Sequence, residues 1–525
     1  MSDLLKHYFE KLMALGPAAA EGRRAFRYVG QLIDLSGDFG REDGTERALQ
    51  LLDELSKRKL TARQAALLEY FRANAWSNRY AVVRRTADLA WGWEQPELQK
   101  QVFHLRRAAG GPGFAKLPSV RRCQVLTNLG NLLRTVGRSV EAVATWSRAL
   151  THDPRFGMAL GNRGYGLMHY AENLYDPGHR GVFLYFAHLD LSAAVSGNAR
   201  FEKAGGKGPK AFFAGKKSEI ELVLDLKTAR RRVKMDGYPL GSSRAERRYR
   251  MWALQERLFL NPLNDLGAHS IAARDILSLP DFVTPLGESP TLIGFFNQMK
   301  QEYVSARWLL FEGLHSARVH FSDRQVTLHN TLDFPSYSLA VEKTKDAYRA
   351  AYSLFDKIAF FLNDYAALKV DLNKVYFKSI WYPTKGAVAG VRDEFRNARN
   401  LPLRGLYWVS KDLFEPAIQE AMEPEAKALY AIRNHLEHRY LKLHDIAVPQ
   451  TGNETYDKMW IDRLAFSLQR DEFEAKTLHV LKLARAALIY LSLAMHREER
   501  RRDAGKPDEI RAPMLLPTLE DRWRR

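Results

Sequence analysis

The sequence predicts an all-α protein in which a helical-repeat solenoid is followed by a helical bundle. Three observations support this prediction. The first half has an internal spacing of 34 residues, and the second half has four segments with apolar residues at three- and four-residue spacing. Both patterns are typical of packed helices, whereas one short alternating run, at residues 319–328, predicts a minor β element.

We expect five regions along the 525 residues of the chain. They are an N-terminal helical segment at 1–44, a repeat region at 45–230, a connecting helical region at 231–335, a helical bundle at 336–505 and a C-terminal tail at 506–525. A chain of this length usually holds several domains of roughly 100–200 residues each.

The composition is that of a folded protein with an affinity for polyanions. Hydrophobic residues make up 46% and aromatic residues 11%, as in globular chains. Lysine and arginine number 80 against 61 acidic residues, giving a formal net charge of +19. A surplus of this size attracts RNA, DNA or anionic membranes.

The sequence indicates a soluble protein of the reducing cytosol. Cys123 is the only cysteine, so it forms no intramolecular disulfide and no thiolate metal cluster. The N-terminus carries charges where a secretory signal needs an apolar core. The longest strongly apolar stretch, residues 486–495, is too short to cross a bilayer. We therefore expect a cytoplasmic location and no membrane contact.

The repeat is clearest around Asn128-Leu129-Gly130, which recurs as Asn162-Arg163-Gly164 at the period of tetratricopeptide repeats. Between the two copies lie a turn glycine, two small residues for close helix packing and a proline after the second helix: Gly137, Ala142, Ala149 and Pro154. This pattern predicts paired helices at 121–136 and 139–151.

Further repeat helices are expected on either side. Residues 65–76 have the same apolar spacing, and residues 185–199 are expected to form a second helix after a long insertion. The stacked units would form a short solenoid whose concave face binds a protein or peptide, while its aromatic residues, Trp146, Tyr165 and Tyr170, belong to the core. The glycine- and lysine-rich residues 205–218 lack P-loop spacing and are expected to be an exposed loop.

The second half predicts helices before and within a bundle. An apolar helix ends at the Asn261-Pro262 turn, and another covers residues 295–308. The bundle helices are expected at 337–366, 406–414, 424–443 and 470–502, with Pro424 in a first turn. The fourth helix presents a buried stripe of Leu478, Leu481, Ala484, Leu488 and Leu491. The longer connections between these helices, at residues 369–403 and 444–462, are here called the joins. They contain Trp381, Tyr382, Pro383 and Trp460, which either shape a substrate entrance or pack in the core.

The third bundle helix carries an arginine and a histidine five positions apart, in Ala431-Ile432-Arg433-Asn434-His435-Leu436-Glu437-His438-Arg439-Tyr440. A guanidinium presents a planar fork of donors to phosphate oxygens, and an imidazole ordinarily exchanges protons near pH ~6.5. Together these side chains can bind a phosphodiester and move its protons.

Arg433-Asn434 followed four positions later by His438 resembles the motif of the HEPN ribonucleases. The resemblance covers roughly residues 249–495. Within the family, the chain is similar to the bacterial branch in which this domain is joined to tetratricopeptide-like repeats. It implies a metal-independent endoribonuclease without a cofactor, acting in prokaryotic defence or as a regulated toxin. It also implies a homodimer, because pairing two bundles would place both motifs in one cleft.

The implied roles are proton transfer for His438, phosphate stabilisation for Arg433, and orientation of the histidine or substrate for Asn434. The nucleophile would be the 2′-hydroxyl of the RNA. An ideal helix places positions 433 and 438 about 140° apart, so the helix alone does not bring the two side chains together. Asp356 and Lys357 add either a polar contact facing the cleft or an ordinary ion pair.

Several alternatives remain open at the level of sequence. Arg433 and Glu437 can form a surface ion pair, and His435 with His438 can ligate zinc, although no third ligand is identified. The chain can also be a non-catalytic scaffold that binds protein or RNA, or an accessory to a nucleotidyltransferase. Cleavage of RNA in the presence of a chelator separates the ribonuclease from these alternatives.

Overall fold

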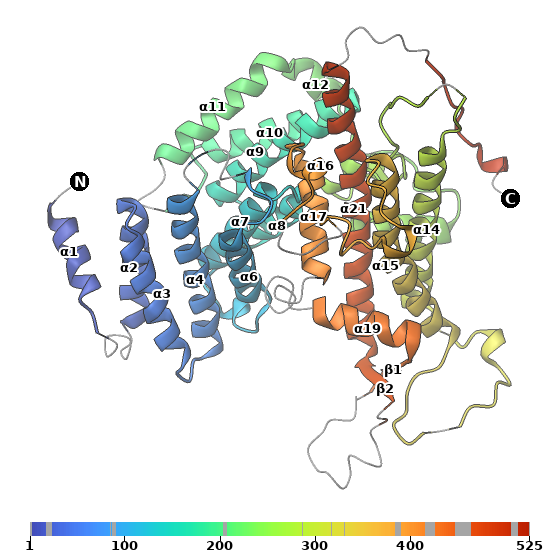
Figure 1. Cartoon of the computed structure of the whole chain (residues 1–525), viewed down its shortest axis with the longest axis horizontal. Helices are drawn as coiled ribbons and strands as arrows, with labels where there is room; N and C mark the ends of the chain where they lie inside the picture. The colour runs from blue at the N-terminus through green and yellow to red at the C-terminus, as the bar shows by residue number, and fades with distance from the viewer. Residues whose placement is uncertain are drawn as a thin grey trace.

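The structure is a computed structural model of the chain, and it confirms the all-α fold class. It describes residues 3–16, 24–84, 86, 91–202, 207–285, 287–316, 318–329, 331–383, 390–414, 426–446, 462, 464–505 and 513–523. Within this part of the chain the only β structure is one two-stranded sheet and an isolated bridge between Phe156 and Arg200. Figure 1 shows the helices of the first half stacked side by side, and those of the second half gathered around the long helix α21 (Arg470–Ala504).

The first half consists of helices that pack in successive pairs. They are α1 (Asp3–Met13), α2 (Ala25–Phe39), α3 (Glu42–Ser56), α4 (Ala62–Val83), α6 (Pro96–Gly110), α7 (Ser119–Thr135), α8 (Ser139–His152), α9 (Gly157–Asn173), α10 (Pro177–Val195), α11 (Lys207–Val223) and α12 (Leu226–Arg232). Helix α4 packs on α6, α7 on α8, and α9 on α10. The helices predicted at 121–136 and 139–151 are confirmed as α7 and α8, and the one at 65–76 lies within α4.

The turn between α7 and α8 needs its glycine for two reasons. Gly137 has a φ of +89°, in the left-handed region that favours glycine. A Cβ at this position would also lie 2.1 Å from the carbonyl oxygen of Leu401 in the second half. The predicted turn glycine is therefore also a point of close backbone contact between the two halves.

Two expectations for the first half are wrong. No long insertion precedes the helix expected at 185–199, because Asp176 caps α10 by accepting a hydrogen bond from the His179 amide at 2.7 Å, and Pro177 begins the helix. Residues 207–218 are not an exposed loop but lie in α11, which buries Phe213 and Ile220. Residues 203–206 of that segment lie outside the described residues. Trp146 and Tyr170 are fully buried, as predicted for core aromatics, and Tyr165 is half-buried against the core.

The second half contains α13 (Arg244–Gln255), α14 (Thr291–His315), α15 (Leu339–Tyr365), α16 (Asp393–Arg396), α17 (Leu401–Phe414), α19 (Ala426–His438) and α21, with strands β1 (Tyr440–His444) and β2 (Ala465–Gln469). Helix α21 lies at the centre, against α14, α15 and α17. Four of the five residues in its predicted stripe are buried, and Leu478 is half-buried. Helix α21 is long and apolar enough to cross a membrane, but 83% of its most apolar window is buried inside the fold, as in a core helix.

Two expectations for the second half are also wrong. The helix expected at 424–443 ends at His438, and Tyr440–His444 forms β1, which pairs in parallel with β2 from Tyr440 opposite Ala465 to His444 opposite Gln469. Pro424 lies outside the described residues. The β element expected at 319–328 is a 3-10 turn at Phe321–Asp323 within irregular chain, and no strand of the described residues pairs with it.

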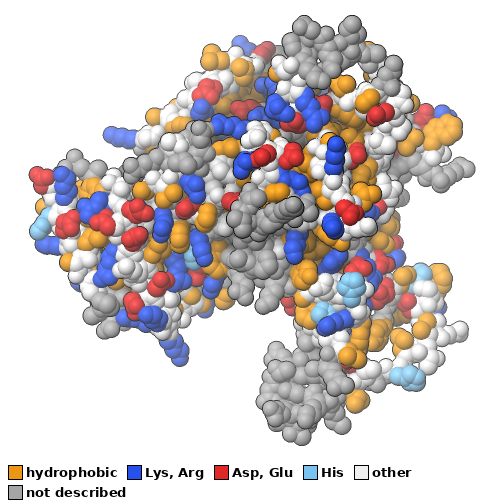
Figure 2. Space-filling view, in the orientation of Figure 1, with side chains coloured by type: hydrophobic (Ala, Val, Ile, Leu, Met, Phe, Trp, Pro, Cys, Tyr) orange, Lys and Arg blue, Asp and Glu red, His pale blue; other side chains and the backbone are white. Residues whose placement is uncertain are grey.

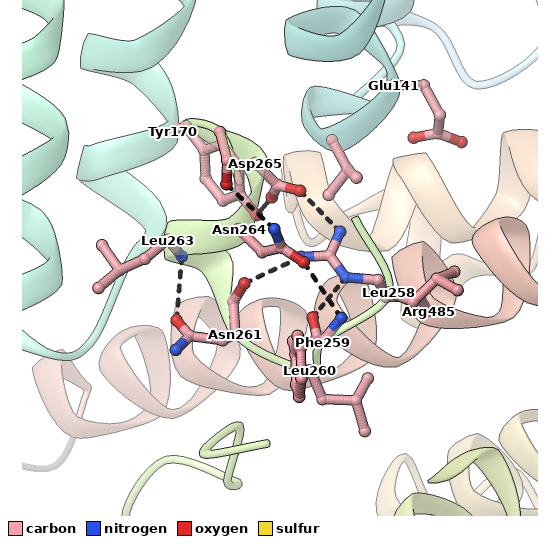
Figure 3. Close-up of polar contacts among 12 residues, drawn as sticks. Glu141, Tyr170, Leu258, Phe259, Leu260, Asn261, Leu263, Asn264, Asp265 and Arg485 are labelled. Carbon is pink, nitrogen blue, oxygen red and sulfur yellow. Dashed lines mark hydrogen bonds and ion pairs between the residues drawn. The ribbon is translucent and has the colours of Figure 1, made fainter. Parts of the chain in front are cut away.

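The two halves are joined by buried charged groups. Asp265, in the 3-10 turn Pro262–Asp265, accepts hydrogen bonds from Arg485 of α21 at 2.6 Å and from Tyr170 of α9 at 2.9 Å (Figure 3). A second cluster joins Asp412 of α17 to Arg106 of α6 and to Arg138 at the start of α8. Both carboxylates are at most 1% exposed, so these ion pairs belong to the core of the molecule.

Candidate active site

Helix α19 carries the predicted site residues and is held by its apolar face. Leu429, Ile432 and Leu436 are buried against the bundle. The hydroxyl of Tyr348 in α15 also donates a hydrogen bond to the carbonyl oxygen of Leu429 at 2.6 Å. This anchoring leaves Arg433, Asn434, Glu437 and His438 on the part of the helix that is half-buried or exposed.

Arg433 is half-buried and points toward α15. The central carbon of its guanidinium lies 5.8 Å from the centre of the Tyr352 ring, which favours a cation over an aromatic face. Among the described residues no carboxylate lies within ion-pair distance of Arg433, so the alternative pairing with Glu437 is not formed. Its donor fork remains available to an anion such as a phosphate.

The surroundings of Arg433 are buried and carry one carboxylate. Burial raises the pKa of the Asp356 carboxyl, while the backbone amide of Phe377, which donates to Asp356 at 3.0 Å, and the Arg433 charge act in the opposite direction. Burial also raises the pKa of the Tyr352 hydroxyl, which has no hydrogen-bond partner in the described part of the chain. Lys357 instead forms an ion pair with Glu302 of α14. Asp356 and Lys357 therefore do not form one unit facing a cleft.

His438 is the last residue of α19, and it is exposed. The structure records no polar contact from its ring, or from the half-buried side chain of Asn434, to any other described residue. The helix closes beside it through a hydrogen bond from the Arg439 amide to the His435 carbonyl at 3.2 Å. The imidazole is thus accessible to a substrate or to a second protein copy.

Arg349 is a site candidate that the sequence does not identify. It lies on α15 and donates a hydrogen bond to the carbonyl oxygen of Leu436 at 2.9 Å. A cation at this position complements the negative end of the α19 dipole. It also brings a second guanidinium to the last turn of the helix, near the backbone that carries His438. Arg349 and Leu436 are 87 positions apart in sequence, so no local pattern signals the contact.

His435 has a structural role rather than a metal-binding one. Its Nδ1 lies 2.7 Å from the carbonyl oxygen of Ala431, and its ring stacks on Phe466 of β2 at 4.9 Å. A search of the described residues finds no group of three or more histidine, cysteine, aspartate or glutamate side chains able to hold a metal ion. The proposed zinc pair of His435 and His438 therefore gains no third ligand there.

The aromatic residues of the joins pack inside the bundle. Trp381 is fully buried and donates a hydrogen bond to the Phe377 carbonyl at 2.8 Å. The Tyr382 hydroxyl lies 3.2 Å from that of Tyr407 in α17. Trp460 lies outside the described residues. Trp381 and Tyr382 support the packing interpretation rather than a substrate entrance.

The site as a whole contains an arginine that pairs with no carboxylate of the described residues, and an accessible histidine at the end of the same helix. The structure records no contact between Arg433 and His438 within the chain. The arginine faces α15 and the histidine lies at the exposed end, as the helical geometry predicts. A phosphodiester in contact with both side chains would have to span the last turn of α19, or be held between two copies of it.

Residues 283–498 match a family model described as LA2681-like HEPN. The matched stretch includes α14, α15, α17, α19, the two strands and nearly all of α21, and therefore contains the whole candidate site. No curated protein and no solved structure matches the chain significantly. The family resemblance of the second half is confirmed by this match, while the tetratricopeptide nature of the first half and the five region boundaries stay predictions.

Proposed function

We propose that this chain, whose C-terminal part contains an HEPN domain, is a metal-independent endoribonuclease acting as a homodimer in prokaryotic defence or as a regulated toxin. One observation carries the proposal. Within that domain, the guanidinium of Arg433 has no carboxylate partner among the described residues, and the accessible His438 ends the same helix. A guanidinium that pairs with no carboxylate can bind a phosphodiester, and an accessible imidazole can move its protons, once the last turn of α19 or a second copy brings the two groups to one substrate.

The reaction follows from the chemistry of these side chains. The 2′-oxygen of one nucleotide attacks the adjacent phosphorus, and the bond from phosphorus to the 5′-oxygen of the next nucleotide breaks. His438 accepts the 2′-hydroxyl proton or supplies a proton to the leaving 5′-oxygen, and Arg433 stabilises charge on the non-bridging oxygens. Asn434 orients the histidine or the substrate. The products are a 2′,3′-cyclic phosphate and a 5′-hydroxyl.

A further property of the chain supports an RNA substrate. The net charge of +19 favours association with a polyanion at cellular salt concentrations. A homodimer would supply a second Arg433 and His438, so that one histidine accepts a proton while the other donates one. The repeat region would then bind the protein or peptide partner that controls cleavage.

The test is the chemistry of the products. Full-length protein is incubated with 5′-labelled single-stranded RNA in EDTA, and the fragments are examined for 2′,3′-cyclic phosphate ends. We expect such ends, and no cleavage at a position where the RNA carries a 2′-deoxynucleotide. Cleavage that needs a divalent metal, or fragments with 3′-hydroxyl ends, would contradict the proposal. RNA binding without cleavage, in both the presence and absence of a cellular extract, would favour the scaffold.

A further inference from the structure

The segment between α14 and α15 exposes more apolar side chains than its surroundings. We call residues 318–329 and 331–337 the arm. Five of its apolar side chains are more than half exposed: Val319 at 66%, Phe321 at 74%, Val326 at 55%, Leu328 at 59% and Phe334 at 65%. The arm projects from the end of the bundle beside β1, and hydrophobic side chains are visible on it in the space-filling view (Figures 1 and 2). Exposed apolar patches of this kind usually mark interaction surfaces.

The base of the arm is fixed on the strand that follows the candidate site. Asp333 forms an ion pair with Lys442 of β1 at 2.7 Å, and both side chains are only 3% exposed. The Ser336 amide donates a hydrogen bond to the Leu443 carbonyl at 2.7 Å, and the His444 ring donates one to the Asp333 carbonyl at 3.0 Å. Asp323 in the 3-10 turn Phe321–Asp323 accepts a hydrogen bond from the Leu339 amide at the start of α15 at 3.0 Å. The arm is therefore held in a defined position beside the end of α19.

The chemistry of the arm fits a protein partner better than RNA. Phe321 and Phe334 offer rings, but Val319, Val326 and Leu328 do not, and surfaces that bind single strands combine stacking aromatics with a basic groove. Arg318 and Arg324 are the only lysine or arginine residues of the arm, and Asp323 lies beside Arg324. The arm thus lacks the basic surplus of the chain as a whole.

A matching apolar surface lies at the same end of the bundle. Tyr430 of α19, Tyr440 of β1 and Leu464 next to β2 are 42%, 41% and 67% exposed, and Ile446 after β1 is 92% exposed. Tyr440 pairs with Ala465 in the sheet, which places it next to Leu464. We call these four residues the receiving surface. An arm and a receiving surface on one chain are the two elements that a symmetric dimer needs, because each copy can offer its arm to the other.

We propose that the arm of each copy docks on the receiving surface of a second copy of this chain, and that this exchange brings the two α19 helices together. The inference rests on the proposed function, in which a second Arg433 and His438 complete the site. The aromatic side chains Phe321 and Phe334 of the arm and Tyr430 and Tyr440 of the receiving surface can each bury about 150–250 Å². Two exchanged arms with their receiving surfaces would then bury well over about 1,000 Å², which is enough for a specific dimer.

The test uses the mass of the full-length protein in solution. Analytical ultracentrifugation of wild type, of an arm variant with Phe321→Asp and Leu328→Asp, and of a receiving-surface variant with Leu464→Asp is carried out at micromolar concentrations. We expect a dimer for wild type and at least a 100-fold weaker association for both variants. The control variant carries Leu222→Asp and Val223→Asp, at equally exposed positions on α11, and should remain dimeric.

A mixing experiment separates arm exchange from general repulsion. In a mixture of the arm variant and the receiving-surface variant, one intact arm can meet one intact receiving surface, so heterodimers should form although neither variant forms a homodimer. A wild-type monomer, or an arm variant that stays dimeric, would overturn the proposal. An arm variant that stays dimeric but loses affinity for labelled RNA in a His438→Ala background would assign the arm to RNA instead.

These outcomes are distinct from those that bear on the proposed reaction. A wild-type protein that dimerises through the arm but cleaves no RNA would contradict the ribonuclease function and leave the arm exchange intact. Circular dichroism of each variant verifies folding, which is expected to be unchanged because all substituted side chains are exposed.

Discussion

An arginine at the junction between the two halves and an arginine at the end of α19 differ in their burial and in their ion pairing. At the junction, Arg485 is almost fully buried and donates to Asp265 and to the carbonyl oxygens of Phe259 and Asn261, at distances of 2.6 to 2.9 Å (Figure 3). At the end of α19, Arg433 lies over Tyr352 and has no carboxylate partner in the described part of the chain.

This difference in pairing distinguishes an arginine that stabilises the fold from one whose donors can still bind a ligand. The charge and donors of the buried Arg485 are matched by Asp265 and two backbone carbonyl oxygens, so Arg485 has no capacity left for a ligand. The donors of Arg433 are not matched in this way, and the neighbouring histidine is accessible. Perturbed or unmatched charged groups of this kind cluster at functional sites. The comparison therefore gives the junction a structural role and agrees with the proposed catalytic role of the end of α19.

The largest expected effect of a substitution on stability is at the junction. Asp265→Ala would leave the buried Arg485 without its counter-charge and Tyr170 without its acceptor, and should lower the free energy of unfolding by about 3–5 kcal/mol. The control is Asp236→Ala, which removes an exposed partner of His269 and should change this free energy by less than about 1 kcal/mol. Urea unfolding followed by circular dichroism gives both values. Equal small changes would contradict the structural role of the junction.

Arg433→Ala should have the reverse profile. We expect the rate of RNA cleavage to fall by about 100-fold or more, because a donor to the transition-state phosphate is lost. The free energy of unfolding should change by less than about 1 kcal/mol, since only a contact with an aromatic ring is removed. Arg433→Lys keeps the charge but not the planar fork, so only part of the rate should be recovered. If Arg433→Ala lowers the free energy of unfolding but leaves the cleavage rate of the folded protein unchanged, the role of Arg433 is structural.

The ion pair at the base of the arm should depend on pH. Burial opposes ionisation of Asp333, but hydrogen bonds from Lys442 and Thr331 outweigh it and hold its pKa below the ordinary value of 3.8. Its contribution to stability is therefore complete above pH 3.8 and lost as the pH falls through the lowered pKa of the folded state. The difference in unfolding free energy between wild type and Asp333→Asn should shrink on acidification below that value. A difference that grows on acidification would show that the pKa of Asp333 is raised, not lowered, in the folded protein.

The smallest effect is expected for Tyr352→Phe. The substitution removes a buried hydroxyl without a hydrogen-bond partner in the described chain and keeps the ring beneath Arg433. We expect a gain in unfolding free energy of about 1 kcal/mol and an unchanged cleavage rate. A large loss of rate with unchanged stability would instead show that the hydroxyl contacts the substrate.

Local patterns in the sequence predict the helices well, because helices are made of local contacts. The repeat spacing gives α7 and α8, and the apolar spacing gives α15, α17 and α21. The same spacing continues from Leu436 into Leu443, so the strand β1 is mistaken for the end of α19. The strand β1 pairs in parallel with β2, which begins about 20 residues later in the chain. Parallel pairing between segments that are not adjacent in sequence leaves no local sequence signal.

The candidate site is predictable only in part for the same reason. The Arg433 and His438 pair stands within one helix and can be read directly from the sequence. Arg349, Tyr352 and the Asp265–Arg485 pair depend on contacts between segments far apart in the chain, which only the structure brings together. The sequence also suggested an ion pair between Arg433 and Glu437, which is absent because Arg433 turns toward α15.

The most direct test of the central claim compares two neighbouring residues of α19. The single-turnover rate of RNA cleavage in EDTA is measured for wild type, His438→Ala and Glu437→Ala, both of which change exposed side chains at the same helix end. Loss of a general acid–base group should lower the rate by about 10²- to 10⁴-fold in His438→Ala and leave Glu437→Ala within a few-fold of wild type. Equal rates for wild type and a folded His438→Ala would contradict the assignment of this helix end as the active site.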